Sequence, residues 1–319
     1  MSMPSRNTHE RISVVLNPRA GNGKAGAKLN EIKAHLNQYF QHWEIHQTKA
    51  PKHAIHLAQQ ACNSGADIIA AVGGDGSCHE VVNGIMTSER KAIFTLIPFG
   101  TGGDLRRTLQ TPKNTRRAIQ IAANGTDLVV DVGKAKVTTD TGQELRYFIN
   151  VAGFGANGAV ADKTNRESKV LGGRVTFLKA TLQTTMTYKA PKVQMFWNGA
   201  TESQWSGELL SCFVANAQFC GGGMKVAPSQ AIADQQLYLS ILPNMSVPKQ
   251  LFHIPKLYDG TIHKVPNSIC CSITELKAAA PRGVDVLIDL DGELGGRLPA
   301  SFSIEKQALV VRAQWQSRD

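Results

Sequence analysis

A strand that runs into glycines and a single acid is the feature that most constrains this chain. The apolar run Ile68–Ala71 leads into VGGDGSCHEVVNG, Val72 to Gly84, which continues with helical periodicity. Glycines at such a junction let backbone amides approach a phosphate at the start of a helix. The aspartate among them, Asp75, would repel a phosphate unless a divalent cation is also present. The segment therefore indicates an α/β domain with a phosphate site that includes a metal ion.

The first 130 residues alternate between strand-like and helix-like segments. The strand candidates are Ile12–Asn17, Trp43–Gln47, Ile68–Val72 and Ala92–Ile97; the helix candidates are Lys24–Phe40, Pro51 to Gly65, Val81–Met86 and Thr111 to Gly125. This rhythm favours a mostly parallel sheet that is covered by helices on both faces. Ligands of such sheets bind beyond the carboxyl ends of the strands, where the glycine-rich segments fall.

Short strand-like segments dominate after residue 131. They are Tyr147–Ala152, Lys192–Trp197, Leu209–Ala215, Leu237–Leu242, Ser268–Leu276 and Val284–Leu290, with helical interruptions expected at Arg174–Tyr188 and Pro248–Tyr258. Such strands are typical of an antiparallel sandwich or a barrel-like domain. We therefore expect an α/β domain over residues 1–130 and a β-rich antiparallel sandwich over 131–319. The last strand candidates, Ser301–Glu305 and Ala308–Ala313, could belong to either domain.

Net charge indicates which kinds of partner to expect, and the cysteine spacing indicates whether zinc or disulfides hold the fold. Lys and Arg number 35 against 25 Asp and Glu, a formal net charge of +10 that attracts polyanions. No aromatic-interleaved RNA-binding pattern or zinc finger accompanies the charge, so we do not expect a nucleic acid partner. The six cysteines form no C-x-x-C pair, which indicates neither a zinc site nor a disulfide framework.

Four features of the α/β half lie at expected strand ends. They are the loop NPRAGNGKAG from Asn17 to Gly26, the residue Thr48, the GGDG loop, and PFGTGGD from Pro98 to Asp104. None has the P-loop spacing, and none has the G-x-G-x-x-G pattern of a dinucleotide-dependent oxidoreductase. Two of the loops place an aspartate among glycines. Amide-lined loops with carboxylates and Mg²⁺ are the equipment of phosphoryl transfer.

Together, the motifs NPRAGNGKAG, GGDGSCHEVVNG, IPFGTGGDLRRTL and IDLDGE resemble the catalytic-domain family of diacylglycerol and sphingosine kinases. The likeness is greatest to the soluble bacterial lipid kinases and covers nearly the whole chain. GGDG alone is also similar to NAD kinases and phosphofructokinases. The resemblance implies an N-terminal domain like that of those enzymes, a β-rich second domain, and an active site in the cleft between them.

The resemblance also implies which residues form the site. Those expected to bind ATP are Asn17, Pro18, Gly21, Thr48, Gly73, Gly74, Asp75, Gly76, Ser77, Glu80, Thr101 and Asp104. Of these, Asp75 and Asp104 would belong to a network of acids, Mg²⁺ and water around the phosphates. Asp291 and Glu293 would complete the catalytic set with Asp75, one of the two acting as general base, and we favour Glu293. Asp291-Gly292 is also a typical hairpin-turn dipeptide.

The family resemblance implies a second, structural Mg²⁺ site, held largely by backbone carbonyls around a D-G-x-L turn. The matching residues here are Ala231, Asp234 and Gln236, but Gln235 stands in place of the glycine. Carbonyl ligands do not depend on side-chain identity, so the site can survive this change. A further departure is Gly103, where the family usually has asparagine; a side-chain amide is lost there.

The implied activity is ATP-dependent transfer of the γ-phosphate to a hydroxyl of a membrane lipid: diacylglycerol, phosphatidylglycerol, a sphingoid base or ceramide. We expect the basic charge to support peripheral contact with an anionic membrane, and an edge strand could form a homodimer. No segment has a signal-peptide core or the ~20 apolar residues of a membrane span, which predicts a cytoplasmic location. Two alternatives stay open: an NAD-kinase-like enzyme with a soluble acceptor, and a catalytically weak lipid- or nucleotide-binding regulator.

Overall fold

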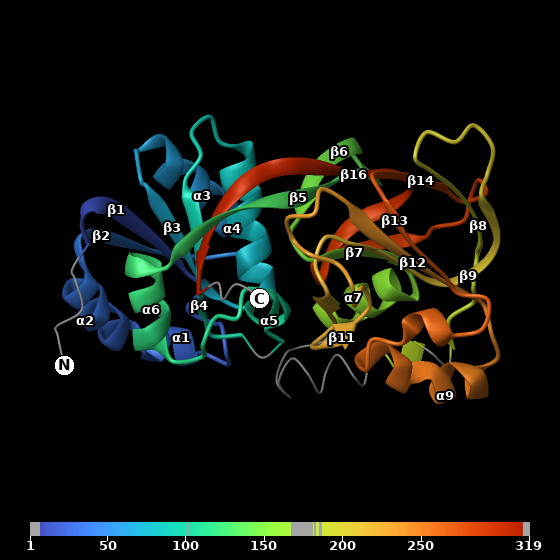
Figure 1. The fold of residues 1–319 in the computed structure, drawn as a ribbon, viewed down its shortest axis with the longest axis horizontal. Helices are drawn as coiled ribbons and strands as arrows, with labels where there is room; N and C mark the ends of the chain where they lie inside the picture. Colours follow the sequence, from blue (N-terminus) through green and yellow to red (C-terminus); the bar gives the residue numbers. More distant parts are fainter. Residues whose placement is uncertain (1–6, 101, 167–180, 182, 185–186, 315–319) are drawn as a thin grey trace. The chain divides into compact units, whose positions relative to one another are not determined.

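The computed structural model describes residues 7–100, 102–166, 181, 183–184 and 187–314 of the chain (Figure 1). These residues divide into two compact units. The first unit is built from the residues up to Val130 and those from Gln307 onward, and the second runs from Asp131 to Lys306. The sequence pattern placed a boundary at residue 130 and left the last strand open; the residues from Gln307 onward belong to the first unit.

The first unit alternates strands and helices. Its elements are β1 (Asn7–Leu16), α1 (Lys24–Ala27), α2 (Leu29–Tyr39), β2 (Phe40–Gln47), α3 (His53–Asn63), β3 (Ile68–Gly73), α4 (Asp75–Thr87), β4 (Ile93–Pro98), α5 (Asp104–Thr108) and α6 (Thr115–Asn124). β1 pairs in parallel with β2 and β3, and β3 pairs in parallel with β4. The last strand, β16 (Glu293–Ala313), pairs in parallel with β4 through Val311 and Phe94.

Burial explains why these segments form strands and helices. All six residues of β3 are buried, which suits a central strand covered on both faces. Helix α2 buries Ile32, Leu36 and Tyr39, residues at the spacing of one helix face. The predicted helix from Lys24 to Phe40 is in fact two helices, which are separated at Lys28, and Phe40 begins β2.

The second unit is β-rich. Its further elements are β6 (Gly142–Phe148), β7 (Val151–Gly155), α7 (Ala156–Arg166), β8 (Lys192–Trp197), β9 (Trp205–Ala215), β10 (Phe219–Cys220), β11 (Met224–Lys225), β12 (Leu237–Pro243), α9 (Val247–Tyr258), the 3₁₀ helix η2 (Ile262–Lys264), β13 (Ile269–Ile273), β14 (Glu275–Ala279) and β15 (Leu287–Leu290). A long strand, β5 (Thr126–Thr139), pairs with β6 and β16 and was not predicted. The predicted Arg174–Tyr188 helix lies largely outside the described residues.

Hydrogen bonds close six of these strands into a ring, in the order β9, β7, β15, β16, β14, β8 and back to β9. All pairs of neighbours in the ring are antiparallel. Strand β14 closes the ring because it bonds to both β16 and β8. The predicted sandwich is therefore a closed, barrel-like arrangement, in which these strands leave no free edge within the ring.

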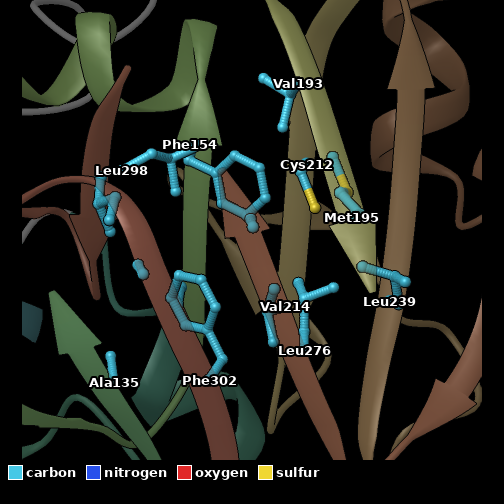
Figure 2. Close-up of a cluster of buried hydrophobic side chains, with 14 of the residues drawn as sticks. Ala135, Phe154, Val193, Met195, Cys212, Val214, Leu239, Leu276, Leu298 and Phe302 are labelled. Atoms are coloured by element: carbon cyan, nitrogen blue, oxygen red, sulfur yellow. The ribbon is translucent and has the colours of Figure 1, made fainter. Parts of the chain in front are cut away.

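Apolar side chains from the ring strands fill the core of the second unit (Figure 2). The rings of Phe154 and Phe302 stack with their centroids 5.8 Å apart and their planes 14° from parallel. Met195, Cys212 and Val214 belong to the same buried cluster. Aromatic pairs of this kind add stability beyond the area that they bury.

A buried arginine ties the returning end of β16 to the start of the chain. The Arg312 guanidinium donates to the Glu10 carboxylate at 2.6 and 2.9 Å and to the Asp127 carboxylate at 2.6 and 2.8 Å. Burial raises the pKa of Glu10, but hydrogen bonds from Arg312 and Asn7 outweigh it, so the pKa lies below its ordinary value. This triad links β1, β5 and β16 within the first unit.

We predict that Arg312→Leu lowers the free energy of unfolding by about 2–3 kcal/mol at pH 7. The cost is below the ~3–5 kcal/mol of breaking a fully buried pair, because both carboxylates are partly exposed. The folded pKa of Glu10 is lowered, so its contribution is lost as the pH falls through that pKa. The difference between variant and wild type should therefore shrink below about pH 4, near the reference pKa of Glu.

Chemical denaturation measures both effects. The matched control is Arg297→Leu, which removes ion pairs to the exposed Asp140 and Asp285 and should cost less than ~1 kcal/mol. An Arg312→Leu loss no larger than that of the control would contradict the structural role of the triad.

Candidate active site

The loops that follow β1, β3 and β4 lie against one another. The Asn17 amide donates to a carbonyl of β3 at 3.0 Å, and the Phe99 amide donates to the Gly73 carbonyl at 2.8 Å. Gly74 and Gly100 meet backbone to backbone: a Cβ on Gly100 would lie 2.4 Å from the Gly74 Cα. Such an approach needs glycine. The predicted phosphate-loop glycines therefore have a first role in bringing these loops together.

The first glycine-rich loop is fixed against the other two. Gly21 adopts a left-handed φ of 61°, and a Cβ there would lie 2.4 Å from the Phe99 carbonyl oxygen. The Asn17 side chain accepts the Arg19 amide at 3.0 Å and donates to the Ser77 hydroxyl at 3.4 Å. Pro18 accepts a hydrogen bond from the Gly26 amide at 3.2 Å. The structure thus brings Asn17 to the GGDG loop and Gly21 to the loop after β4, while Pro18 contacts Gly26 within its own loop.

The Asp75 carboxylate holds the loop after β4. It starts α4, and its two oxygens accept the Gly103 amide at 2.8 Å and the Leu105 amide at 3.0 Å. Asp104 is 6% exposed and pairs with Arg107, whose guanidinium also donates to the Gly102 carbonyl; both distances are 2.8 Å. Thr101 lies outside the described residues. A negative charge in the first turn of α4 is also favoured by the helix dipole.

Gly103 keeps the backbone shape of this loop. Its φ of 68° and ψ of 44° lie in the left-handed region, where it caps α5. Asparagine is among the few other residues that visit this region readily. A glycine where the resembling family has asparagine therefore preserves the backbone and removes only the side-chain amide.

Glu80 positions the segment that follows Thr48. Its carboxylate accepts the Lys52 amide at 2.9 Å and the Ala54 amide at 3.0 Å, at the start of α3. Thr48 lies at the end of β2, where its amide donates to the Leu16 carbonyl at 2.9 Å. Glu80 thus caps a neighbouring helix and supports the Thr48 loop, in addition to any contact with a ligand.

The two acids of the second unit lie in different environments. Asp291 and Gly292 form the β15–β16 turn with φ of 55° and 93°, as in a type I′ hairpin. The Asp291 carboxylate accepts three backbone amides, from Ile149 at 2.9 Å, Asn150 at 2.8 Å and Val151 at 3.1 Å. Glu293 is partly exposed, and among the described residues its carboxylate has no hydrogen-bond or ion-pair partner.

The residues expected to ligate a structural cation converge on a side chain. The Gln230 Nε2 donates to Asp234 Oδ1 at 2.7 Å, to the Gln236 carbonyl at 2.8 Å and to the Ala231 carbonyl at 3.3 Å. Gln235 holds the glycine-like φ of 61°. With the amide nitrogen among these oxygens, the observed arrangement does not fit a bound cation.

The glycine-rich loops of the first unit are a different case for Mg²⁺. Across the described residues, no three or more His, Cys, Asp or Glu side chains group into a metal site. Nucleotide-bound Mg²⁺ usually takes one or two carboxylates, with phosphates and water completing the shell. Each oxygen of Asp75 can accept more than one contact, so the residues at these loops fit such an ion.

Two residues that contact the predicted site residues were not predicted from the sequence. Arg107 is three residues from Asp104 in the DLRRT helix, and this i, i+3 spacing of opposite charges could have found the pair. Gln230 carries no comparable signal, because its contacts depend on how the turn after it folds.

The two supporting carboxylates predict separable local effects. Asp75→Ala should speed amide hydrogen exchange in the peptide that contains Gly103 and Leu105, because both amides lose their acceptor. Glu80→Ala should instead speed exchange at Lys52 and Ala54. Mass spectrometry of exchanged peptides measures both, and each variant is the control for the other. If both peptides exchange in both variants at the wild-type rate, these roles are refuted.

Comparisons with known proteins cover both units. Residues 11–135 match the model of the diacylglycerol kinase catalytic domain, and residues 150–313 match that of the YegS C-terminal NAD kinase β-sandwich-like domain. A diacylglycerol kinase of Staphylococcus aureus (strain bovine RF122 / ET3-1) is 26% identical over 294 residues, spanning 92% of this chain and 89% of the relative.

Solved structures share the fold. The crystal structure of a diacylglycerol kinase from Bacillus anthracis str. Sterne matches with a TM-score of 0.71 and 20% identity, over 96% of this chain and 97% of that one. An NAD kinase from Archaeoglobus fulgidus, in complex with ATP, matches with a TM-score of 0.52 and 13% identity, over 95% and 94% of the two chains. Since the motifs and both domain models agree, the chain belongs to the diacylglycerol kinase catalytic-domain family of lipid kinases.

Proposed function

We propose that this protein is an ATP-dependent kinase that transfers the γ-phosphate to a hydroxyl of a membrane lipid. The observation that carries the proposal is the set of glycine loops packed at the start of α4. The first hydrogen bond of α4 runs from the Cys78 amide to the Gly74 carbonyl at 3.1 Å. The amides of Gly76 and Ser77 precede it, in the position of anion-binding donors at a helix start.

The loops would bind and orient the triphosphate. Gly73 to Ser77 offer backbone donors, while Asn17, Gly21 and Thr48 border the nucleotide from neighbouring strand ends. Asp75 and Asp104 would hold Mg²⁺, directly or through water, and the ion would offset the charge of the phosphates. Fixed donors of this kind act mainly by positioning and by neutralising charge, which is most of what phosphoryl transfer requires.

Glu293 is the proposed general base. Its carboxylate has no partner among the described residues, whereas the Asp291 oxygens already accept three amides. In the proposed step the lipid hydroxyl gives its proton to Glu293, and its oxygen bonds to the γ-phosphorus. The bond from that phosphorus to the β–γ bridging oxygen breaks, and ADP leaves. Asp291 then serves as a positioning residue that fixes the turn carrying Glu293.

The lipid acceptor is supported by the family relationship, since the curated relative is a diacylglycerol kinase over most of both chains. The NAD-kinase alternative has only the fold in its favour. Gly103 gives little support to a catalytically weak regulator, because it keeps the left-handed backbone that asparagine also tolerates.

We predict that Glu293→Gln and Asp291→Ala fail in different ways. Glu293→Gln should lower kcat by about 10²–10⁴-fold, the usual contribution of a general base, with an unchanged Tm. Asp291→Ala should lower both kcat and Tm, because three buried or half-buried amides lose their acceptor. Labelled ATP in mixed micelles and thermal unfolding measure the two quantities. Glu293→Gln turnover within about tenfold of wild type would exclude it as the base.

An acceptor panel tests the substrate class. We expect phosphate transfer to at least one of diacylglycerol, phosphatidylglycerol, sphingosine and ceramide, and none to NAD. Phosphorylation of NAD with no lipid product would overturn the proposal in favour of the soluble-acceptor alternative.

A further inference from the structure

We propose that the side-chain amide of Gln230 replaces the structural cation that the family resemblance implies. Its nitrogen lies 2.7 Å from Asp234 Oδ1, 2.8 Å from the Gln236 carbonyl and 3.3 Å from the Ala231 carbonyl. The same three oxygens are the ligands expected of the cation site. Gln230 is 3% exposed, so the amide is buried where it makes these contacts.

The three contact distances suit an amide nitrogen, and a metal ion cannot occupy the position of that nitrogen. Mg²⁺ and Ca²⁺ bind oxygen at about 2.0–2.6 Å, and the two hydrogens of an amide nitrogen would face such an ion. A cation would therefore have to displace the Gln230 side chain. The Asp234 charge is instead met by hydrogen bonds, since it also accepts the Ala231 and Gln236 amides at 3.2 and 3.1 Å.

The turn is also anchored from outside. The Gln235 amide donates to the Asp131 carboxylate at 2.6 Å, and Asp131 is 1% exposed. The Gln230 backbone is fixed as well, because its carbonyl accepts the Gln218 side chain at 3.0 Å. The polypeptide alone thus holds the shape that a bound ion would otherwise hold, and this turn needs no divalent cation.

Removal of the amide should create a cation site. We expect the Tm of the nucleotide-free wild type to be the same in EDTA and in Mg²⁺ or Ca²⁺. Gln230→Ala should have a lower Tm that Mg²⁺ or Ca²⁺ partly restores. Mn²⁺ binding, followed by electron paramagnetic resonance, should be stronger in Gln230→Ala by at least about tenfold.

Asp234→Asn in the Gln230→Ala background is the control, and it should abolish the gained Mn²⁺ binding. If Gln230→Ala does not fold, Mn²⁺ binding to the wild type and to Asp234→Asn still tests the proposal. Mn²⁺ binding to wild type that Asp234→Asn removes would overturn the proposal, and wild-type binding indifferent to Asp234→Asn would support it.

A second inference rests on α9, whose outward face is apolar. The exposed residues Pro248, Leu251, Phe252, Pro255 and Tyr258 repeat at helical spacing. Phe252 is 76% exposed, Leu251 43% and Tyr258 44%, and no residue of this helix is buried. Large apolar side chains gathered on one exposed face usually mark an interaction surface.

The charges near this face are mainly basic. Lys249 and Lys264 are exposed, and the Lys256 ammonium donates to the Lys264 carbonyl of η2 at 2.8 Å. The nearby acid, Asp259, bonds to the amide and hydroxyl of Thr261 at 2.8 and 2.6 Å. An apolar face with flanking lysines complements an anionic lipid surface.

We infer that α9 lies in the plane of an anionic membrane surface, with Phe252 at the centre of the contact. None of the helices in the described ranges has the length and apolar character to span a bilayer. This inference rests on the proposed function, because docking would give the enzyme access to its lipid substrate. Its test does not, because binding is measured without ATP.

Vesicle sedimentation tests the face directly. The double variant Leu251→Ser, Phe252→Ser should lose at least about tenfold in binding to vesicles that contain phosphatidylglycerol, and high salt should weaken wild-type binding. Leu145→Ser, which changes an exposed apolar residue of β6 that is 51% exposed, is the matched control and should bind as wild type.

Turnover separates this proposal from the proposed function. The α9 variant should lose activity on lipid in vesicles and retain it on a short-chain, water-soluble diacylglycerol. If the wild type binds vesicles but phosphorylates no lipid, the membrane contact of α9 is supported and the proposed kinase function is rejected. Unchanged vesicle binding by the α9 variant would overturn the inference. A dimer that this variant dissolves, with no vesicle binding by wild type, would also overturn it and assign the face to a second copy.

Discussion

The glycine-rich loops after β3 and β4 depend on a contact that only glycines allow. The chain after β3 and the chain after β4 touch at Gly74 and Gly100, where a side chain on Gly100 would overlap the opposite backbone. The Asp75 carboxylate then fixes this contact through the Gly103 and Leu105 amides. A carboxylate in a phosphate loop is therefore compatible with anion binding, because its charge is directed at backbone donors of the neighbouring loop.

Two other candidate acids also accept backbone amides of neighbouring segments. Glu80 accepts two amides at the start of α3, and Asp291 accepts three in the second unit. Glu293 has no such partner among the described residues. The acids that sequence motifs mark as one group thus divide into carboxylates that accept backbone amides and one, Glu293, that makes no such contact among the described residues.

Local patterns predicted much of the fold, and long-range contacts account for most of what was missed. Buried runs such as Ile68–Val72 and the apolar stripe of α2 are visible in the sequence because their periodicity reflects burial. Strand β5 was missed although Val132, Ala135 and Val137 are buried in it, and its pairing with β16 joins distant parts of the chain. The Arg312 triad joins residues up to 302 positions apart, which no local pattern reports. In the candidate site, motif order selected the residues and favoured Glu293 over Asp291, whereas the contacts of these two acids and the position of Gln230 needed the structure.

The most direct measurement is a crystal structure of the protein with Mg²⁺ and a non-hydrolysable ATP analogue. We predict that the phosphates bind to the Gly76 and Ser77 amides, with the Asp75 carboxylate still accepting the Gly103 and Leu105 amides. Phosphates bound away from the start of α4, or Asp75 released from the loop after β4, would contradict it.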